Sequence, residues 1–239
     1  MTREELAYKV LPGFLLEIMK RYLRVRVFGV RHVPLKGPYI VIANHSGFMG
    51  FDALMIVHNL KKLKRRPPQI IAHKMWFLSP EISVHAEKMG LIPAKFENGL
   101  KLLESKKPLL LFPEGEEGNF KPTKYRYRLR PFRRGFVRLA LSTGVPIVPA
   151  VVIGAEETRI TLSQIRWAKQ LIGIIVPVPL NLFPLPAKWQ IHFLPPIHLE
   201  KDLEKAKDLK YVTALSKKLR RDFQREMNLR LRDRQLVFV

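Results

Sequence analysis

A histidine and an acid follow one of the most apolar stretches of the sequence. The run 39–43 leads directly into Asn44-His45, and Asp52 comes seven positions after the histidine. An imidazole whose far ring nitrogen donates a hydrogen bond to a carboxylate is held in the tautomer that takes a proton near pH 7. If residues 46–52 are largely helical, both side chains return to one face after about two turns. The pattern predicts His45 as a general base and Asp52 as the acid that orients it.

Ser46, next to this histidine, is a second candidate for chemistry because its hydroxyl is a possible nucleophile. Its position beside Gly47 and Gly50 is more typical of a sharp turn out of a strand. Such a turn would leave His45 exposed at the edge of a sheet, where the active sites of α/β proteins are found. We therefore expect Ser46 to shape the turn.

Another polar block follows a second apolar run. Phe112-Pro113-Glu114-Gly115 comes after the run 108–111 and opens a loop. Gly115 and Gly118 can offer backbone N–H groups, and the Glu114 carboxylate can accept from a hydroxyl or orient a cation. The alternative interpretation is that these residues form a polar turn that binds no ligand.

Seven cations and no acid lie between residues 121 and 134, with Lys121 first. In an extended segment Arg126, Arg128 and Arg130 share one face, and guanidinium groups at that spacing suit a phosphate. These four cations are our candidate substrate-binding residues. A solvated or lipid-headgroup-binding surface is the alternative interpretation.

The blocks resemble the glycerolipid acyltransferases, the 1-acylglycerol-3-phosphate or lysophospholipid acyltransferase family, whose founding bacterial members make phosphatidic acid from lysophosphatidic acid and an acyl thioester. The resemblance covers most of the chain and includes, in the family's order, Asn44-His45 with Asp52, GLIPA from Gly90, the Phe112 block and GVPIVPA from Gly144. Four blocks in order are a specific signal.

The chain looks closest to a subgroup with a longer third block, here FPEGEEGNFK from Phe112, followed by YRL from Tyr127 and GFVRLA from Gly135. Two features depart from the usual pattern. Six residues rather than four separate the histidine from the acid, and the arginine expected near Phe96 is absent.

The resemblance implies that His45 and Asp52 are catalytic and that Glu114 and Gly115 help to position the acceptor. A thioester carbonyl is already activated, so the reaction needs a base and a site for the developing oxyanion but no covalent nucleophile. We expect no cofactor, with acyl-CoA or acyl carrier protein as the co-substrate. No histidine pair has carboxylates at metal-ligand spacing, so we expect no metal.

The composition favours anionic partners. The formal net charge is +23, from 43 Lys and Arg against 20 Asp and Glu; an anionic membrane, an acidic carrier protein, coenzyme A and nucleic acid all attract such a surface. No zinc-finger spacing or RNP-like aromatic block is present, so we expect no nucleic acid. The absence of cysteine excludes disulfides and a cysteine nucleophile. The N-terminus lacks the features of a signal peptide, and we expect an intracellular protein.

Apolar runs alternate with amphipathic segments along most of the chain. This alternation predicts strands covered on both faces, hence an α/β fold. We expect a single-domain mixed sheet flanked by helices over residues 25–239, of the glycerol-phosphate acyltransferase type that the resemblance implies. Strands are predicted at 25–30, 38–43, 68–72, 108–112, 146–153 and 188–193, and helices near 51–63, 80–89, 97–106, 133–143 and 203–232.

Residues 1–24 are predicted to form an amphipathic, membrane-interacting helical arm. Apolar side chains recur at four-residue steps over residues 4–24, with Lys and Arg on the other side. Pro12-Gly13 is expected to break the helix into two pieces. Such a helix suits the headgroup region of an anionic membrane, although a helix packed on its own domain has the same pattern.

The segment 171–186 contains sixteen residues without a charge. It is too short and too rich in proline to span a bilayer as a regular helix. A buried loop, a lip that dips into the membrane and a wall for an acyl chain all remain open.

The sequence as a whole predicts a membrane-peripheral acyltransferase of phospholipid biosynthesis, at the cytoplasmic face of a membrane. It moves a fatty acyl group from acyl-CoA or acyl carrier protein to the hydroxyl of a lysophospholipid, with lysophosphatidate as the expected acceptor. The alternative is a non-catalytic basic protein that binds anionic lipid or nucleic acid. Release of free thiol from an acyl thioester, with and without lysophosphatidate, discriminates the two.

Overall fold

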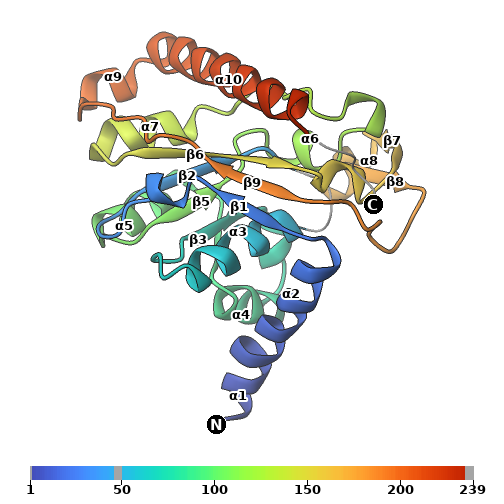
Figure 1. The fold of residues 1–239 in the computed structure, drawn as a ribbon. Helices are drawn as coiled ribbons and strands as arrows, with labels where there is room; N and C mark the ends of the chain where they lie inside the picture. Colours follow the sequence, from blue (N-terminus) through green and yellow to red (C-terminus); the bar gives the residue numbers. More distant parts are fainter. Residues whose placement is uncertain (1, 46–49, 235–239) are drawn as a thin grey trace.

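The computed structural model describes residues 2–45 and 50–234. A β-sheet lies at its centre. Within this part of the chain the sheet has seven strands in the order β1-β9-β6-β2-β5-β3-β4 (Figure 1). All neighbours pair in parallel except β6 and β9. The strands are β1 (Arg26–Phe28), β2 (Ile40–Ala43), β3 (Gln69–Ala72), β4 (Leu91–Pro93), β5 (Leu109–Leu111), β6 (Ile147–Ile153) and β9 (Gln190–Phe193). The predicted α/β fold with a mixed sheet is confirmed.

Helices cover both faces of the sheet. Strands such as β2 and β6 are consequently buried along their whole length. One hydrophobic core lies under α5 (Phe96–Glu104), α7 (Gly135–Thr143), α9 (Leu203–Lys207) and α10 (Leu209–Arg232). A second core lies on the opposite face, under α3 (Phe51–Lys62) and α4 (Pro80–Lys88). The fold is therefore a three-layer sandwich of helices, sheet and helices (Figure 1).

Two strands outside the central sheet were not predicted. β7 (Thr161–Ile165) and β8 (Val176–Pro179) pair antiparallel as a separate two-stranded sheet, and α8 (Ala168–Ile172) connects them. The segment 171–186, which the sequence left open, therefore contains the end of α8, the strand β8 and a loop. Part of it lies on the surface, since Leu182 and Phe183 are 83% and 85% exposed.

The N-terminal helix is continuous where a break was expected. Helix α1 (Arg3–Glu5), a π-helical turn at Leu6–Val10 and α2 (Leu11–Tyr22) follow without interruption, so the predicted break at Pro12-Gly13 is wrong. Pro12 occupies the first turn of α2, where its missing N–H is tolerated. No helix within residues 2–45 and 50–234 is long and apolar enough to cross a membrane.

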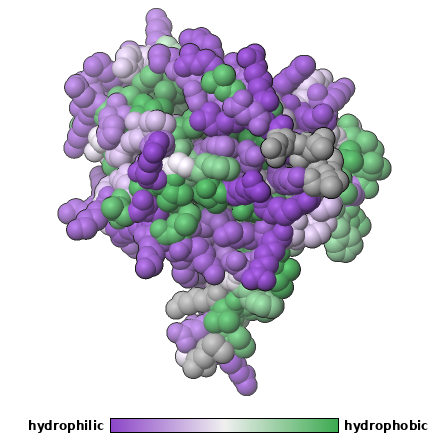
Figure 2. Space-filling view, in the orientation of Figure 1, coloured by the Kyte–Doolittle hydropathy of each residue, from purple (hydrophilic) through white to green (hydrophobic). Residues whose placement is uncertain are grey.

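The two faces of α2 have different surroundings. Leu16 and Met19 pack against the core beneath α3, and the Glu17 carboxylate lies 3.0 Å from His58 Nε2 of that helix. The other face is open to solvent, with Leu11, Phe14, Leu15 and Ile18 each about half exposed or more. Packing on the domain and an exposed apolar face thus occur in the same helix, and Figure 2 shows this apolar surface on the protruding end of the molecule.

The long C-terminal helix predicted at 203–232 is two helices. The chain leaves the helical conformation at Asp208, whose side chain accepts from the backbone N–H groups of Lys210 and Tyr211 and so caps α10. Val212, Leu219, Phe223 and Met227 form the buried face of α10.

Candidate active site

The position of His45 is fixed by its neighbour at the end of β2. Asn44 is fully buried, and its side-chain amide makes two hydrogen bonds with the backbone of Val152 in β6: Nδ2 donates to the carbonyl at 2.9 Å and Oδ1 accepts from the N–H at 2.8 Å. These bonds continue the β2–β6 pairing by one residue through a side chain. His45 therefore leaves the sheet at a defined point.

His45 and Asp52 are in direct contact. The Nδ1 atom of His45 lies 2.7 Å from Asp52 Oδ2, and the other carboxylate oxygen of Asp52 accepts from the Ala53 N–H at 2.8 Å. The Asp52 side chain is inaccessible to solvent, whereas that of His45 is 14% exposed. With Nδ1–H donating to the carboxylate, Nε2 keeps its lone pair and can accept a proton.

The helical path considered from the sequence for residues 46–52 falls mostly on residues 46–49, which lie outside the described residues. Helix α3 begins at Phe51, and Gly50 before it has a left-handed φ of 74°. Asp52 is thus in the first turn of α3, where the helix N-terminus favours a carboxylate. Ser46 and Gly47 lie outside the described residues.

The block that begins at Phe112 contacts His45 through two of its residues. Phe112 follows β5, the parallel neighbour of β2, and its ring stacks on the imidazole with centroids 4.0 Å apart. Glu114 is buried, and its two oxygens accept from the backbone N–H groups of His45 at 3.2 Å and Arg130 at 2.7 Å. The contacts of Glu114 are therefore with the protein itself. A Cβ at Gly118 would lie 2.4 Å from that of Glu114, so glycine is required there.

Lys121 lies in the protein interior, not on the surface of a phosphate site. Its Nζ is 2.9 Å from Glu156 Oε1 and 3.7 Å from Glu114 Oε2, and its side chain is 3% exposed. Burial raises the pKa of Glu156 to about 7 against the opposing effect of the Lys121 ammonium. The Tyr127 N–H donates to the same carboxylate at 2.9 Å. This buried cluster anchors the loop that carries Glu114.

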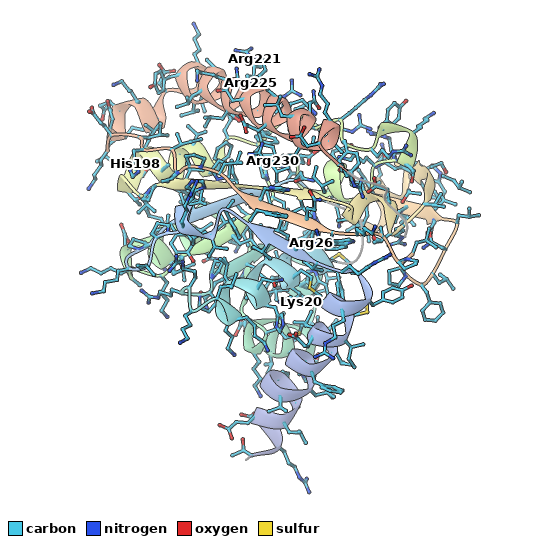
Figure 3. All side chains as sticks on the ribbon, viewed as in Figure 1. Lys20, Arg26, His198, Arg221, Arg225 and Arg230 are labelled. Atoms are coloured by element: carbon cyan, nitrogen blue, oxygen red, sulfur yellow. The ribbon has the colours of Figure 1, made fainter. Side chains whose placement is uncertain are left out.

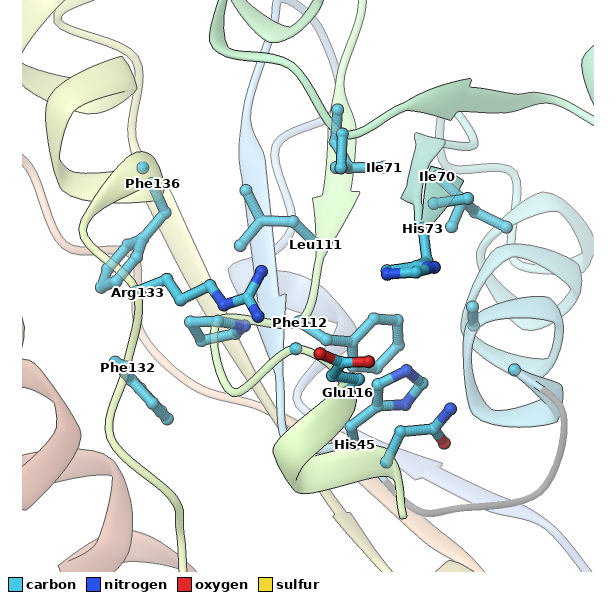
Figure 4. A pocket seen from close by; sticks show the side chains of 18 of the residues that line it. His45, Ile70, Ile71, His73, Leu111, Phe112, Glu116, Phe132, Arg133 and Phe136 are labelled. Atoms are coloured by element: carbon cyan, nitrogen blue, oxygen red, sulfur yellow. The ribbon is translucent and has the colours of Figure 1, made fainter. Parts of the chain in front are cut away.

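A cavity of about 1340 Å³ opens at the carboxyl ends of the parallel strands, and His45 lines it. Figure 4 shows His45 near the middle, between Ile70 and His73 on one side and Arg133 with Phe136 on the other. The wall next to α3 and α4 is apolar and includes Ile70, Met75, Trp76, Ile82, Met89 and Leu91. The wall next to α7 and α10 is cationic and includes Arg133, Arg134, Arg138, Lys217, Arg220 and Arg221.

Of the predicted substrate-binding residues, Gly115 is in the lining of this cavity. The expected extended arginine segment is interrupted, because Tyr127 adopts a φ of 59° after a 3-10 turn at Thr123–Tyr125. Arg126 and Arg128 are exposed outside the lining, and the guanidinium of Arg130 lies 5.0 Å from the centre of the Tyr125 ring.

Arg133 lines the cavity but was not predicted as a site residue. Its guanidinium passes directly over Gly115, within 3.0 Å of where a Cβ would be, and its backbone N–H donates to the Pro113 carbonyl at 2.8 Å. The signal was its place in the run of cations after Gly118. The arginines of α10 could not be predicted as lining residues, because only the tertiary structure brings them to the cavity.

A second histidine and a carboxylate also face the cavity. His73 follows β3; its Nδ1 accepts from the Met75 N–H at 3.3 Å, and burial lowers its pKa. The Glu116 carboxylate is paired with Lys169 and accepts from the Ile175 N–H at 3.4 Å. Burial acts to raise the pKa of Glu116, but these partners lower it overall. Glu116 is therefore an anion in the lining of the cavity, paired with Lys169.

Comparisons with known proteins agree with this architecture. Residues 24–153 match the family described as Acyltransferase. An uncharacterized protein of Mycobacterium tuberculosis is 39% identical in a match that covers 74% of this chain and 53% of that protein. The human 1-acyl-sn-glycerol-3-phosphate acyltransferase alpha is 27% identical, with 72% of this chain and 61% of that protein covered. The chain thus spans little more than half the length of these relatives.

The crystal structure of the 1-acyl-sn-glycerophosphate acyltransferase from Thermotoga maritima superimposes with a TM-score of 0.60, covering 99% of this chain and 86% of that one. At 17% sequence identity this likeness shows a shared fold. The fold and the site together define a class of protein. It is an α/β sandwich with a histidine and an acid at the carboxyl edge of its sheet. The match over more than half of the sequence shows that the chain belongs to the acyltransferase family.

Proposed function

We propose that this protein transfers a fatty acyl group from an acyl thioester to the hydroxyl of a lysophospholipid, most simply lysophosphatidate, as a step of phospholipid biosynthesis at a membrane surface. The observation that carries the proposal is the His45–Asp52 hydrogen bond at a cavity with one apolar and one cationic wall. An acyl chain suits the first wall, and the anionic ends of the substrates suit the second.

In the proposed reaction His45 Nε2 takes the proton from the acceptor hydroxyl as its oxygen attacks the thioester carbonyl. Asp52 stabilises the imidazolium that forms. The tetrahedral intermediate then breaks its carbon–sulfur bond, and the leaving thiolate takes the proton from the imidazolium. The products are an ester and a free thiol, and the histidine returns to its starting state.

The acceptor's phosphate is proposed to bind Arg133. This guanidinium lies over Gly115 in the cavity that His45 lines, whereas Arg126 and Arg128 are on the outer surface. A planar guanidinium can hold a phosphate by two parallel hydrogen bonds. Glu114 would then act indirectly, by fixing the backbone of His45.

The membrane is proposed as a partner because apolar side chains are exposed in two places on a cationic protein. These are the open face of α2 and the loop after β8, seen as green surface in Figure 2. A lysophospholipid and its product both reside in a bilayer, so an enzyme at its surface meets them there. The cytoplasmic face of a membrane is the proposed location.

The test is free thiol release from palmitoyl-CoA in the presence of lysophosphatidate. His45→Ala is expected to lower kcat by about two to four orders of magnitude, since general-base catalysis contributes about that much. Asp52→Asn is expected to lower kcat strongly with little change in KM. His198→Ala is the matched control, because His198 is exposed and outside the cavity lining. Near wild-type transfer by a folded His45→Ala protein would refute the mechanism.

A further inference from the structure

The exposed face of α10 carries a dense group of cations. The helix has eight lysines and arginines against the two acids Asp222 and Glu226. The buried face of the helix is apolar, and six of its eight cations are exposed, whereas Arg220 and Arg230 are partly buried. Figure 3 shows Arg221 and Arg225 projecting from this helix away from the body of the protein.

A separate hollow of about 380 Å³ lies on this face. Four guanidinium groups surround it together with two amides and one apolar side chain, from the residues Arg220, Arg221, Gln224, Arg225, Asn228, Leu229 and Arg232. Within the described residues no ion pair is recorded for Arg220, Arg221 or Arg232. The hollow thus offers cations with little competition from protein carboxylates.

The hollow adjoins the cationic wall of the main cavity. Arg220 and Arg221 line both spaces. The segment 127–129 holds this part of α10 in place, because Gln224 bonds to the backbone of Tyr127 and Leu129 and the Arg220 guanidinium donates to the Leu129 carbonyl at 3.1 Å. A cationic path therefore runs from the cavity along a fixed helix; Lys217 and Arg232 at its ends are fifteen residues, roughly 22 Å, apart.

We propose that this hollow binds the phosphorylated nucleotide end of the acyl donor, so that the donor is an acyl-CoA whose pantetheine arm leads into the main cavity. This inference rests on the proposed acyl transfer. The guanidinium groups of Arg221, Arg225 and Arg232 suit phosphates. The Leu229 side chain, 45% exposed, and the Asn228 amide suit the face and edge of a purine.

An acidic carrier protein is the competing donor, and the size of the site favours the nucleotide. A hollow of about 380 Å³ accommodates a nucleoside phosphate. A protein would instead contact a broad surface, with about 800 Å² buried on each partner, and would not depend on one phosphate.

The experiment measures KM for palmitoyl-CoA and for S-palmitoyl-pantetheine, which has the same thioester but lacks the nucleotide. Arg225→Gln combined with Arg232→Gln removes two guanidinium groups of the hollow that are outside the main cavity. We expect at least a fivefold rise in KM for palmitoyl-CoA, with the KM values for S-palmitoyl-pantetheine and lysophosphatidate unchanged. In the wild type, dephospho-coenzyme A should bind at least fivefold more weakly than coenzyme A in calorimetry.

The control is Arg26→Gln combined with Arg31→Gln, which removes the same charge from exposed positions that line neither the hollow nor the main cavity. An equal rise in KM for both donors, or an equal effect of the control, would overturn the proposal. A rise confined to palmitoyl-acyl carrier protein would overturn it in favour of a carrier-protein surface. If the wild type transfers from none of these donors, the proposed function fails, and calorimetry with coenzyme A still decides whether the hollow binds the nucleotide.

Discussion

At the scale of single residues, the proposal that one arginine binds the phosphate of the acceptor can be tested. The sequence pattern points to Arg126, Arg128 and Arg130, whereas the structure has Arg133 in the cavity over Gly115. Arg133→Gln is therefore expected to raise KM for lysophosphatidate about tenfold or more, since a charge-assisted hydrogen bond contributes about 1.5–3 kcal/mol. Transfer to an uncharged monoacylglycerol should change much less.

Arg128→Gln is the matched comparison for this prediction, because Arg128 is exposed and outside the cavity lining. If Arg128→Gln alters the preference between the two acceptors and Arg133→Gln does not, the phosphate site lies on the outer arginine segment. Equal effects on both acceptors would show that neither arginine recognises a phosphate.

A second prediction at this scale concerns the buried Glu156. Its pKa is about 7 in the folded protein, mainly because of burial, against an ordinary value of 4.5. Between these values the folded state holds a proton that the unfolded state releases, so this group's stabilising contribution is complete below about pH 4.5 and is lost as the pH rises through 7. Glu156→Gln should consequently lose less stability than the wild type between pH 5 and pH 8, measured as the urea midpoint.

Glu104→Gln provides the control for Glu156→Gln, since Glu104 is an exposed carboxylate at the end of α5. It should leave the pH dependence of the urea midpoint as in the wild type. A Glu156→Gln protein with the wild-type pH dependence would mean that the Lys121 ammonium keeps Glu156 ionised throughout this range.

At the scale of secondary structure, strong apolar periodicity was sufficient for most of the central sheet. The run 146–153 was predicted and forms β6, and the helix near 51–63 is α3. The strands β4, β7 and β8 were not predicted, and proline accounts for two of them. β4 is a three-residue edge strand that ends in proline, and β8 reads VPVP, in which proline suggests a loop.

The site divides in the same way between local and tertiary information. His45 and Asp52 are seven residues apart, so their contact could be predicted from the sequence. Lys121 could not be placed, because its partner Glu156 is distant in the chain and pairs with it only in the folded protein. The departure of the arginine segment from an extended form depends on the positive φ of Tyr127, which a residue other than glycine seldom adopts.

At the scale of the whole molecule, the two exposed apolar surfaces are tied to one another. The Tyr22 hydroxyl of α2 donates to the Pro184 carbonyl at 2.9 Å, and the Arg24 guanidinium donates to that of Pro186 at 2.7 Å. The open face of α2 and the loop with Leu182 and Phe183 are therefore held as parts of one body. Val176 and Pro177 of β8, which precede this loop, line the main cavity.

Two joined surfaces should bind a membrane more strongly than either alone, because the second contact is made within an already bound molecule. Phe14→Gln with Ile18→Gln should lower flotation with anionic vesicles, as should Leu182→Gln with Phe183→Gln, each pair by about tenfold in the partition coefficient. All four changes together should lower it further, while KM for a detergent-dispersed acceptor stays unchanged.

The control for these variants is Leu35→Gln with Leu203→Gln, which removes two exposed leucines from other parts of the surface, 67% and 53% accessible. It should float like the wild type. If the α2 pair alone matters, the loop after β8 has no membrane role, and the alternative of a wall for the acyl chain gains weight. The acyl-chain wall can be tested with the same variant. If the loop contacts the acyl chain, Leu182→Gln with Phe183→Gln should raise KM for long-chain but not for short-chain acyl donors. The measurement is made in detergent, where no membrane is present.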